Sequence, residues 1–163
     1  MALSLETFFV YPTPLGRITL ASDGKALTHM AFGVQQFPGI YTATALTNRA
    51  STEIQEYLAG KRTVFDIPLN PYGTQYQQKV WRALCSIPYG ETRSYKEVAQ
   101  MTGKPNAMRA VGMANNKNPL PVFIPCHRVI GARGDLVGYA YGLKIKQFLL
   151  DLEKKATENG RLR

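Results

Sequence analysis

A proline-bounded apolar segment that ends in a cysteine and a histidine constrains this chain most strongly. Residues 119–131 read Pro-Leu-Pro-Val-Phe-Ile-Pro-Cys-His-Arg-Val-Ile-Gly. Proline fixes the backbone and removes a hydrogen-bond donor, so an apolar run between prolines is stiff and suits a buried or edge position. The segment therefore predicts that Cys126 is held at a fixed place, next to His127 and Arg128.

Cys126 is a candidate nucleophile. The thiolate is the reactive form, and a free thiol with a pKa of about 8.5 is only slightly ionised at neutral pH. The adjacent His127 can accept the proton, and nearby positive charge lowers the pKa further. Because neighbouring residues of an extended chain point to opposite faces, we expect the two side chains to meet across a turn or through a bridging water. This geometry predicts a moderately activated thiol.

The last helix offers a carboxylate that could orient the histidine. Its apolar stripe is predicted to consist of Ile145, Phe148, Leu149 and Leu152. The opposite face is predicted to carry most of Lys144, Lys146, Asp151, Lys154 and Lys155. Glu153 lies at the edge of the stripe, and two interpretations stay open. Residue type favours a solvated surface glutamate, whereas a buried carboxylate would need an imidazole or an arginine beneath it.

The remaining cysteine and histidine carry no obvious chemistry. Cys85 is predicted to be a small buried side chain near the end of a helix, and His29 a structural residue of a strand. No second ligand stands at metal-binding spacing, so we expect no metal site. The sequence also shows no secretory signal and no apolar run of the roughly 18 residues that a membrane helix needs. We expect a cytoplasmic protein that does not contact membranes.

Two domains are expected, with a boundary at Asn70-Pro71-Tyr72-Gly73. In residues 1–72, β-rich runs at 7–11, 17–21 and 26–32 predict strands, 52–59 a short helix and 65–69 a last extended segment. These residues hold five basic and five acidic side chains, so residues 73–163 hold the entire net charge of +9. Such an asymmetry fits a surface that binds a polyanion, although a solvated lysine-rich face would look the same.

Residues 73–163 are rich in helix starts. Capping boxes at Thr74–Gln77 and Ser94–Glu97 predict two helices, and Asn106 is expected to cap a third over 107 to about 116. Two short helices joined by a turn at Gly103 in a basic region predict a helix-turn-helix, with an ordinary helical hairpin as the alternative. Arg109 and its small neighbours on the second helix favour close approach to a nucleic acid.

The second domain resembles the O6-alkylguanine-DNA alkyltransferases, also called methylated-DNA–protein-cysteine methyltransferases, of the compact bacterial type. The resemblance runs from about residue 72 to 153. It rests on Val80-Trp81, Ile87-Pro88-Tyr89-Gly90, Ser94-Tyr95, Arg109-Ala110-Val111-Gly112, Asn118-Pro119, Pro125-Cys126-His127-Arg128 and Leu149-Leu150 before Glu153. It implies an α+β fold. Residues 1–72 would form a small N-terminal antiparallel sheet with a helix and serve a structural role. Residues 73–163 would form a mainly helical, winged helix-turn-helix-like domain that carries the reactive cysteine.

The resemblance also implies a reaction. Cys126 would accept the alkyl group from O6 of guanine, and possibly from O4 of thymine, in a single irreversible displacement. His127 would remove the thiol proton through a water, Glu153 would orient His127, and Asn118 would brace the cysteine loop. No cofactor is implied, because the thiolate is the stoichiometric reagent. The partner would be double-stranded DNA containing O6-alkylguanine, bound by a monomer.

By the same resemblance, the damaged base is turned out of the duplex. Arg109 would fill the gap and Tyr95 would help to rotate the nucleotide, with Ala110 and Arg128 as further DNA contacts. The guanine pocket is expected to consist of Tyr95, Val129, Tyr139, Ala140 and Tyr141. Tyr141 departs from the family, which usually has glycine there, and its ring could either exclude bulky adducts or swing away.

Three other functions would account for part of the pattern. A DNA-binding regulator without chemistry explains the charge but leaves Cys126, His127 and Glu153 without a purpose. A zinc base deaminase needs a second cysteine three positions after Cys126, where Val129 stands, and a His-x-Glu upstream. A cysteine hydrolase would turn over repeatedly, whereas self-alkylation stops after one equivalent.

Overall fold

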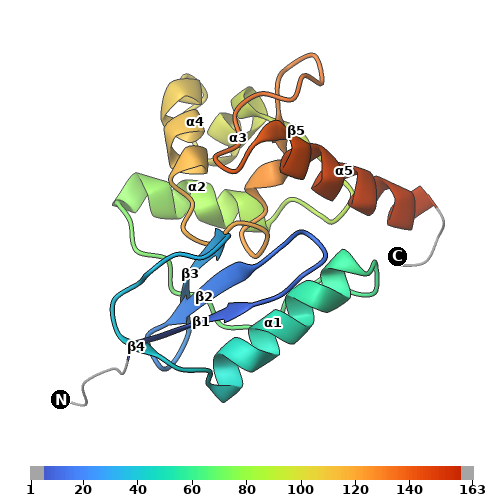
Figure 1. The fold of residues 1–163 in the computed structure, drawn as a ribbon. Coiled ribbons are helices and arrows are strands. Elements are labelled where there is room, and N and C mark those ends of the chain that lie inside the picture. The colour runs from blue at the N-terminus through green and yellow to red at the C-terminus, as the bar shows by residue number, and fades with distance from the viewer. Residues whose placement is uncertain (1–5, 159–163) are drawn as a thin grey trace. The chain divides into compact units, whose positions relative to one another are not determined.

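The structure is a computed structural model that describes residues 6–158. The chain divides into two compact units, Met1–Tyr72 and Gly73–Arg163 (Figure 1). Each unit has its own secondary structure, and the predicted α+β class is confirmed.

The first unit is built on a four-stranded sheet in the order β3-β2-β1-β4. Strands β1 (Thr7–Tyr11), β2 (Ile18–Ser22) and β3 (Leu27–Phe32) form antiparallel pairs, close to the predicted ranges. The short β4 (Ile40–Tyr41) pairs with β1 in parallel, so the sheet is mixed rather than purely antiparallel. The predicted strand at 65–69 contributes only an isolated bridge from Leu69 to Leu27.

Helix α1 (Ala45–Leu58) packs against β1 and β2 and begins seven residues earlier than predicted. The reason is a capping box that we missed. The Thr44 side chain accepts a hydrogen bond from Thr47 N, and the Thr47 side chain accepts one from Thr44 N. Two threonines do not match the usual Ser/Thr with Glu/Gln pattern, but their hydroxyls satisfy the same free amides.

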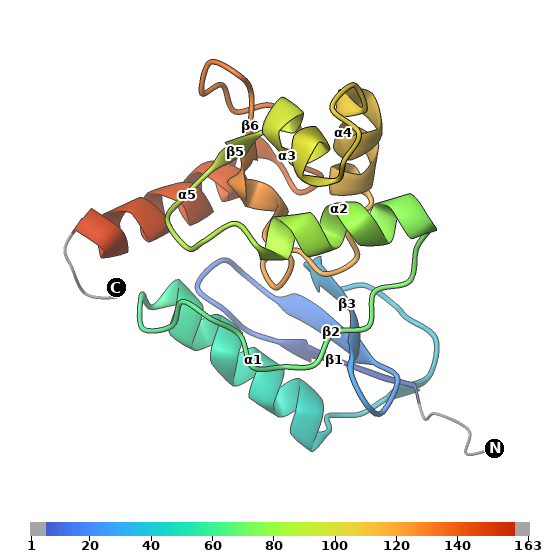
Figure 2. The same cartoon turned by 180° about the vertical axis from the view of Figure 1, so that it is seen from behind.

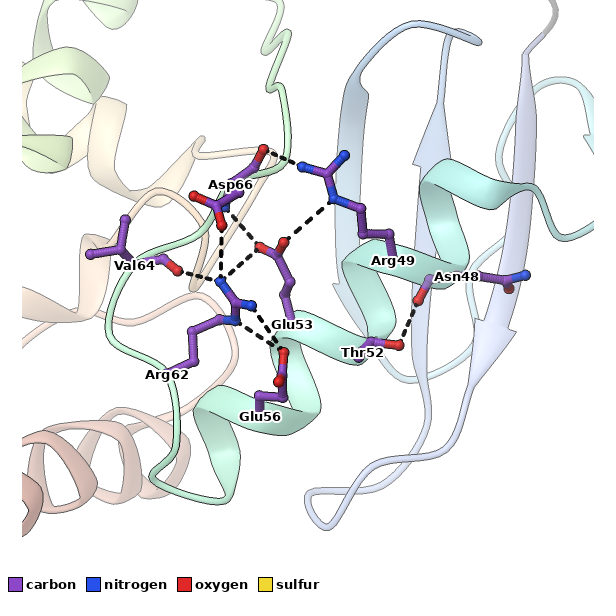
Figure 3. A network of polar contacts seen from close by, with 8 residues as sticks. All are labelled: Asn48, Arg49, Thr52, Glu53, Glu56, Arg62, Val64 and Asp66. Carbon is purple, nitrogen blue, oxygen red and sulfur yellow. Dashed lines mark hydrogen bonds and ion pairs between the residues drawn. The ribbon is translucent and has the colours of Figure 1, made fainter. Parts of the chain in front are cut away.

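A network of hydrogen bonds and ion pairs joins residues 62–66, which follow α1, to that helix (Figure 3). Glu53 is buried, and its Oε1 accepts a hydrogen bond of 2.8 Å from Asp66 N. Arg49 and Arg62 lie 3.6 and 3.7 Å from the same carboxylate. Arg62 also pairs with Glu56 at 3.1 Å. The charge of Glu53 is thus compensated from both sides, which a buried carboxylate requires.

The second unit contains the remaining helices. Both predicted capping boxes are confirmed: Thr74 and Gln77 open α2 (Gln75–Cys85), and Ser94 and Glu97 open α3 (Tyr95–Met101). Helix α4 (Met108–Asn116) follows, and α3 and α4 pack on each other and on α2. In both views α4 and the last helix, α5 (Leu143–Glu158), lie at opposite ends of this unit (Figures 1 and 2).

The predicted cap of α4 is wrong. Its N-cap is Ala107, with no side-chain hydrogen bond, rather than Asn106. A turn in which Ala107 N donates to Lys104 O uses the preceding residues, so the helix starts one residue later without a polar cap.

The predicted inward face of α5 is also partly wrong. Its buried residues are Lys146, Leu149, Glu153 and Ala156, whereas Phe148 is 40% exposed. The buried stripe shares Leu149 with the prediction but is turned round the helix, because hydrogen bonds inside the protein satisfy the charged groups of Lys146 and Glu153. Within residues 6–158, no helix has the length and apolarity needed to cross a membrane.

Candidate active site

The cysteine segment ends in a tight turn that leads into a strand. Cys126–Arg128 form one turn of 3-10 helix, η1, followed directly by β6 (Val129–Ile130). Strand β6 pairs in parallel with β5 (Arg93–Ser94), whose last residue caps α3. This pairing brings the start of α3, with Tyr95, to the cysteine turn. Because Cys126 and His127 belong to the 3-10 turn, this part of the chain is not extended, and both side chains are buried.

Glu153 joins this turn to α5 through three hydrogen bonds and accepts a fourth from Gly90. Its Oε2 lies 2.7 Å from His127 Nε2 and accepts a 3.0 Å bond from Arg128 Nη2. Its Oε1 accepts from Arg128 Nε at 2.9 Å and from Gly90 N at 3.0 Å. The structure thus decides between the two sequence interpretations: Glu153 is 1% exposed, and both an imidazole and an arginine lie against it.

These contacts fix the charge state of the pair. Burial alone would raise the pKa of Glu153, but the hydrogen bond from His127 and the Arg128 guanidinium lower it to about 2. Burial lowers the pKa of His127, although Glu153 opposes this shift. At neutral pH the carboxylate is charged and the imidazole neutral. Since Nε2 faces a carboxylate that can only accept, Nε2 carries the proton and Nδ1 is the acceptor nitrogen of the ring.

Two asparagines position the cysteine backbone. Asn118 Nδ2 donates to Ile124 O at 2.8 Å, and Asn118 Oδ1 accepts from Leu120 N at 2.9 Å. Asn115, on the buried face of α4, donates to Cys126 O at 3.3 Å. The Asn118 side chain also hydrogen-bonds the thiol, which favours its ionised form. Asn118 therefore closes the loop in the manner expected of a brace, whereas Asn115 was not anticipated.

Lys146 is a site residue that the sequence analysis placed on the wrong face of α5. Its side chain is fully buried, and Nζ donates to Val129 O at 2.6 Å and Val137 O at 3.0 Å. Its positive charge favours the Cys126 thiolate. The sequence did contain a pattern consistent with the burial of Lys146, because positions 146, 149, 153 and 156 recur at the spacing of one helix face.

The thiol is less acidic than predicted. Burial raises the pKa of Cys126 to about 11, and Asn118 and Lys146 offset only part of this. The neighbouring imidazole does not reverse it, because His127 is itself buried and neutral. Cys126 is thus a protonated thiol at neutral pH that needs a base to ionise it.

Three tyrosines lie within electrostatic reach of the sulfur. Burial raises the pKa of Tyr95, Tyr139 and Tyr141, and in each case the Cys126 charge adds to the effect. The Tyr139 and Tyr141 ring centroids lie 6.0 Å apart, edge to face. Tyr95 OH donates to Val137 O at 2.9 Å. Val129 is buried, and its N–H donates to Cys126 O. Four of the five predicted pocket residues therefore lie near Cys126, and the fifth, Ala140, is exposed.

The residues expected to contact DNA divide into two groups. Arg109 and Ala110 lie on α4 and are exposed. Arg128 is buried instead, with Nη1 donating to Ile87 O at 2.7 Å and the rest of the guanidinium bound to Glu153. The structure therefore gives Arg128 a place in the core, where it balances a buried carboxylate, and not on a surface that DNA could reach.

The other two candidates have different outcomes. Cys85 is exposed, contrary to the prediction, because it follows the buried Leu84 at the last position of α2 and so lies further round the helix. His29 bonds Thr28 Oγ1 through Nδ1 at 3.0 Å, and its ring lies 5.0 Å from that of Phe37, as expected of a structural residue. Among residues 6–158, no three His, Cys, Asp or Glu side chains come together as metal ligands.

Comparison with known proteins assigns the family. The model described as "6-O-methylguanine DNA methyltransferase, DNA binding domain" matches residues 75–155, and the "ribonuclease-like domain" model of the same family matches residues 8–71. A Methanosarcina barkeri protein named methylated-DNA–protein-cysteine methyltransferase is 49% identical over 150 residues, which cover 89% of this chain and 95% of that protein. The chain belongs to the 6-O-methylguanine DNA methyltransferase family.

Solved structures of this methyltransferase family have the same fold. The Mycobacterium tuberculosis OGT, crystallised in complex with DNA, superimposes with a TM-score of 0.86 at 44% identity, covering 92% of this chain and 94% of that one. The O6-methylguanine methyltransferase of the same organism gives a TM-score of 0.85 at 43% identity, with 93% and 94% covered. The α+β architecture of this chain is therefore that of the family.

The high pKa of the thiol makes a prediction. Because Cys126 stays protonated until the pH approaches about 11, we expect its alkylation by iodoacetamide to speed up about tenfold per pH unit between about pH 7 and 9.5. Peptide mass spectrometry would follow Cys126, with the exposed Cys85 as a reference in the same sample. A rate for Cys126 that levels off near neutral pH would show that the free protein holds a thiolate instead.

Proposed function

We propose that this chain repairs DNA by moving a methyl group from O6 of guanine onto its own Cys126, once per molecule. The observation that carries the proposal is the buried Cys126 turn, with His127 held by Glu153 at 2.7 Å. Membership of the 6-O-methylguanine DNA methyltransferase family supports the same conclusion. In the transfer, the bond from sulfur to the methyl carbon forms as the bond from that carbon to O6 breaks. The guanine keeps the electron pair.

His127 acts as the base in this proposal. The thiol has a pKa of about 11 and must lose its proton as it attacks. The neutral imidazole accepts this proton at Nδ1 through a bridging water, while the carboxylate of Glu153 stabilises the imidazolium that forms. Arg128 is a positioning residue, because it holds Glu153 and does not touch the substrate. Lys146 adds positive charge near the developing thiolate.

Duplex DNA is the partner, and the second unit binds it. Helices α3 and α4 form the helix-turn-helix, with Arg109 and Ala110 on the exposed face of α4. Arg109 fills the space left when the damaged nucleotide turns outward, and Tyr95 assists that rotation. Tyr95, Val129, Tyr139, Ala140 and Tyr141 form the pocket for the alkylated guanine, and O4-alkylthymine is a second possible substrate. Extrusion costs a few kcal/mol, least for a weakly paired damaged base, which favours the lesion.

The two units have different tasks in this proposal. Residues 73–163 bind DNA and accept the alkyl group, whereas residues 1–72 give structural support. The protein acts as a monomer in the cytoplasm and needs no cofactor, since the sulfur is consumed as the reagent.

Intact-mass measurement tests the proposal. Incubation with an excess of duplex containing O6-methylguanine should add one methyl group and then stop, and Cys126→Ala should gain none. A DNA-binding regulator without chemistry would gain no mass, and a hydrolase would continue to turn over. Either result with a folded protein would overturn the proposed function.

Tyr141 should limit the size of the adduct. Its ring lies beside Tyr139 and within electrostatic reach of Cys126. We expect normal repair of methyl adducts but slower repair of benzyl adducts, and Tyr141→Gly should raise the benzyl rate relative to the methyl rate. Single-turnover rates on the two duplexes measure this ratio. An unchanged ratio in the variant would show that the ring swings away from the alkyl group.

A further inference from the structure

The DNA-facing side of α4 carries a side chain that the proposed mechanism does not use. The buried residues of α4 are Val111, Ala114 and Asn115. Met113 is 63% exposed and lies four residues after Arg109, which places both on the same exposed face. Side chains at this spacing have Cβ atoms about 5–6 Å apart. Met113 is therefore the next side chain on the face of α4 that carries Arg109, the residue proposed to enter the duplex.

Exposed methionine is concentrated on this part of the molecule. All three methionines of residues 73–163 are exposed, and they lie on α3 and α4: Met101 42%, Met108 47% and Met113 63%. A single exposed apolar side chain is ordinary, and a separation of five residues turns Met108 about 140° round α4 from Met113. Met113 is thus the methionine that shares a helix face with Arg109, and this face combines a cationic with an apolar side chain. Methionine suits such a surface, because its unbranched, polarisable side chain adapts to an irregular partner.

The charge of the surrounding surface indicates what kind of partner it binds. Residues 98–134 contain no aspartate or glutamate, and Lys104, Arg109 and Lys117 of this stretch are exposed. A surface that is cationic overall with apolar side chains between the charges complements the minor groove, where phosphates flank apolar sugar edges. Proteins that distort DNA from this groove commonly insert apolar side chains, methionine among them, beside opened base steps.

We infer that Met113 is a second minor-groove contact, which packs against sugar and base edges next to the step that Arg109 opens. The inference rests on the proposed function. In this role Met113 stabilises the distorted duplex while Arg109 occupies the space of the extruded base. It does not touch the alkyl group, so it contributes to duplex binding and not to the transfer step.

Duplex affinity and single-turnover repair of wild type, Met113→Ala, Met113→Gln and Met113→Leu test the inference. We expect about fivefold weaker binding to a duplex containing O6-methylguanine for the alanine and glutamine variants, as partial burial of a methionine side chain supports. Leucine should restore the affinity. Because no charge is removed, the salt dependence of binding should stay that of wild type.

Two controls separate this effect from others. The same lesion in a single-stranded oligonucleotide offers no minor groove, so all Met113 variants should repair it at the wild-type rate. Val64→Ala removes a side chain that is 67% exposed and lies outside the matched DNA-binding segment, and should leave duplex binding unchanged.

The outcomes distinguish the inference from the proposed function. Wild-type duplex affinity in Met113→Ala and Met113→Gln would overturn the inference and leave the proposed function intact. An equal loss on single-stranded and duplex substrates would also overturn it, because the effect would then act through the fold. A wild-type protein that takes a methyl group from neither substrate would overturn the proposed function itself.

Discussion

The second unit depends on one buried carboxylate. Removing an ionised glutamate from water costs several kcal/mol unless it is paired and fully hydrogen-bonded. Glu153, on helix α5, meets this requirement with donors from two other segments of the chain: the η1 turn, through His127 and Arg128, and the loop at Gly90. The same contacts that make its burial tolerable also orient the imidazole next to the reactive cysteine.

Helix α4 links the proposed DNA-binding surface to the loop of Cys126. Its exposed face carries Arg109, while Asn115 on its buried face donates to the carbonyl of Cys126. Asn118, just beyond the helix, bonds both the cysteine loop and the thiol. The helix that we propose binds the duplex therefore also holds the loop that carries Cys126, so that in the proposed function DNA binding and alkyl transfer depend on the same element.

Local signals in the sequence were sufficient for much of this architecture. The two capping boxes and the β-rich runs depend on residues a few positions apart, and the structure has these elements near the predicted places. The convergence of Cys126, His127 and Glu153 required the family resemblance, because 26 residues separate His127 from Glu153. No local pattern reports such a contact.

Predictions failed where tertiary packing overrides residue type. Lys146 and Arg128 are charged side chains that an analysis of residue types places in solvent, yet both are buried because carbonyls and a carboxylate meet their charges. The prediction of a moderately activated Cys126 thiol failed for the same reason. The sequence shows the imidazole beside it but not the depth of burial, and burial has the larger effect.

The most direct test is the rate of methyl transfer in Glu153→Gln. The fluorescence of Trp81 would first show that the variant is folded, because Trp81 is the chain's one tryptophan and is buried in the second unit. Glutamine keeps the shape of the side chain but cannot stabilise an imidazolium. The account predicts that duplex affinity stays within about twofold of wild type, while the single-turnover rate falls about a hundredfold or more, as for the loss of a general base. A folded Glu153→Gln protein that transfers the methyl group at the wild-type rate would contradict it.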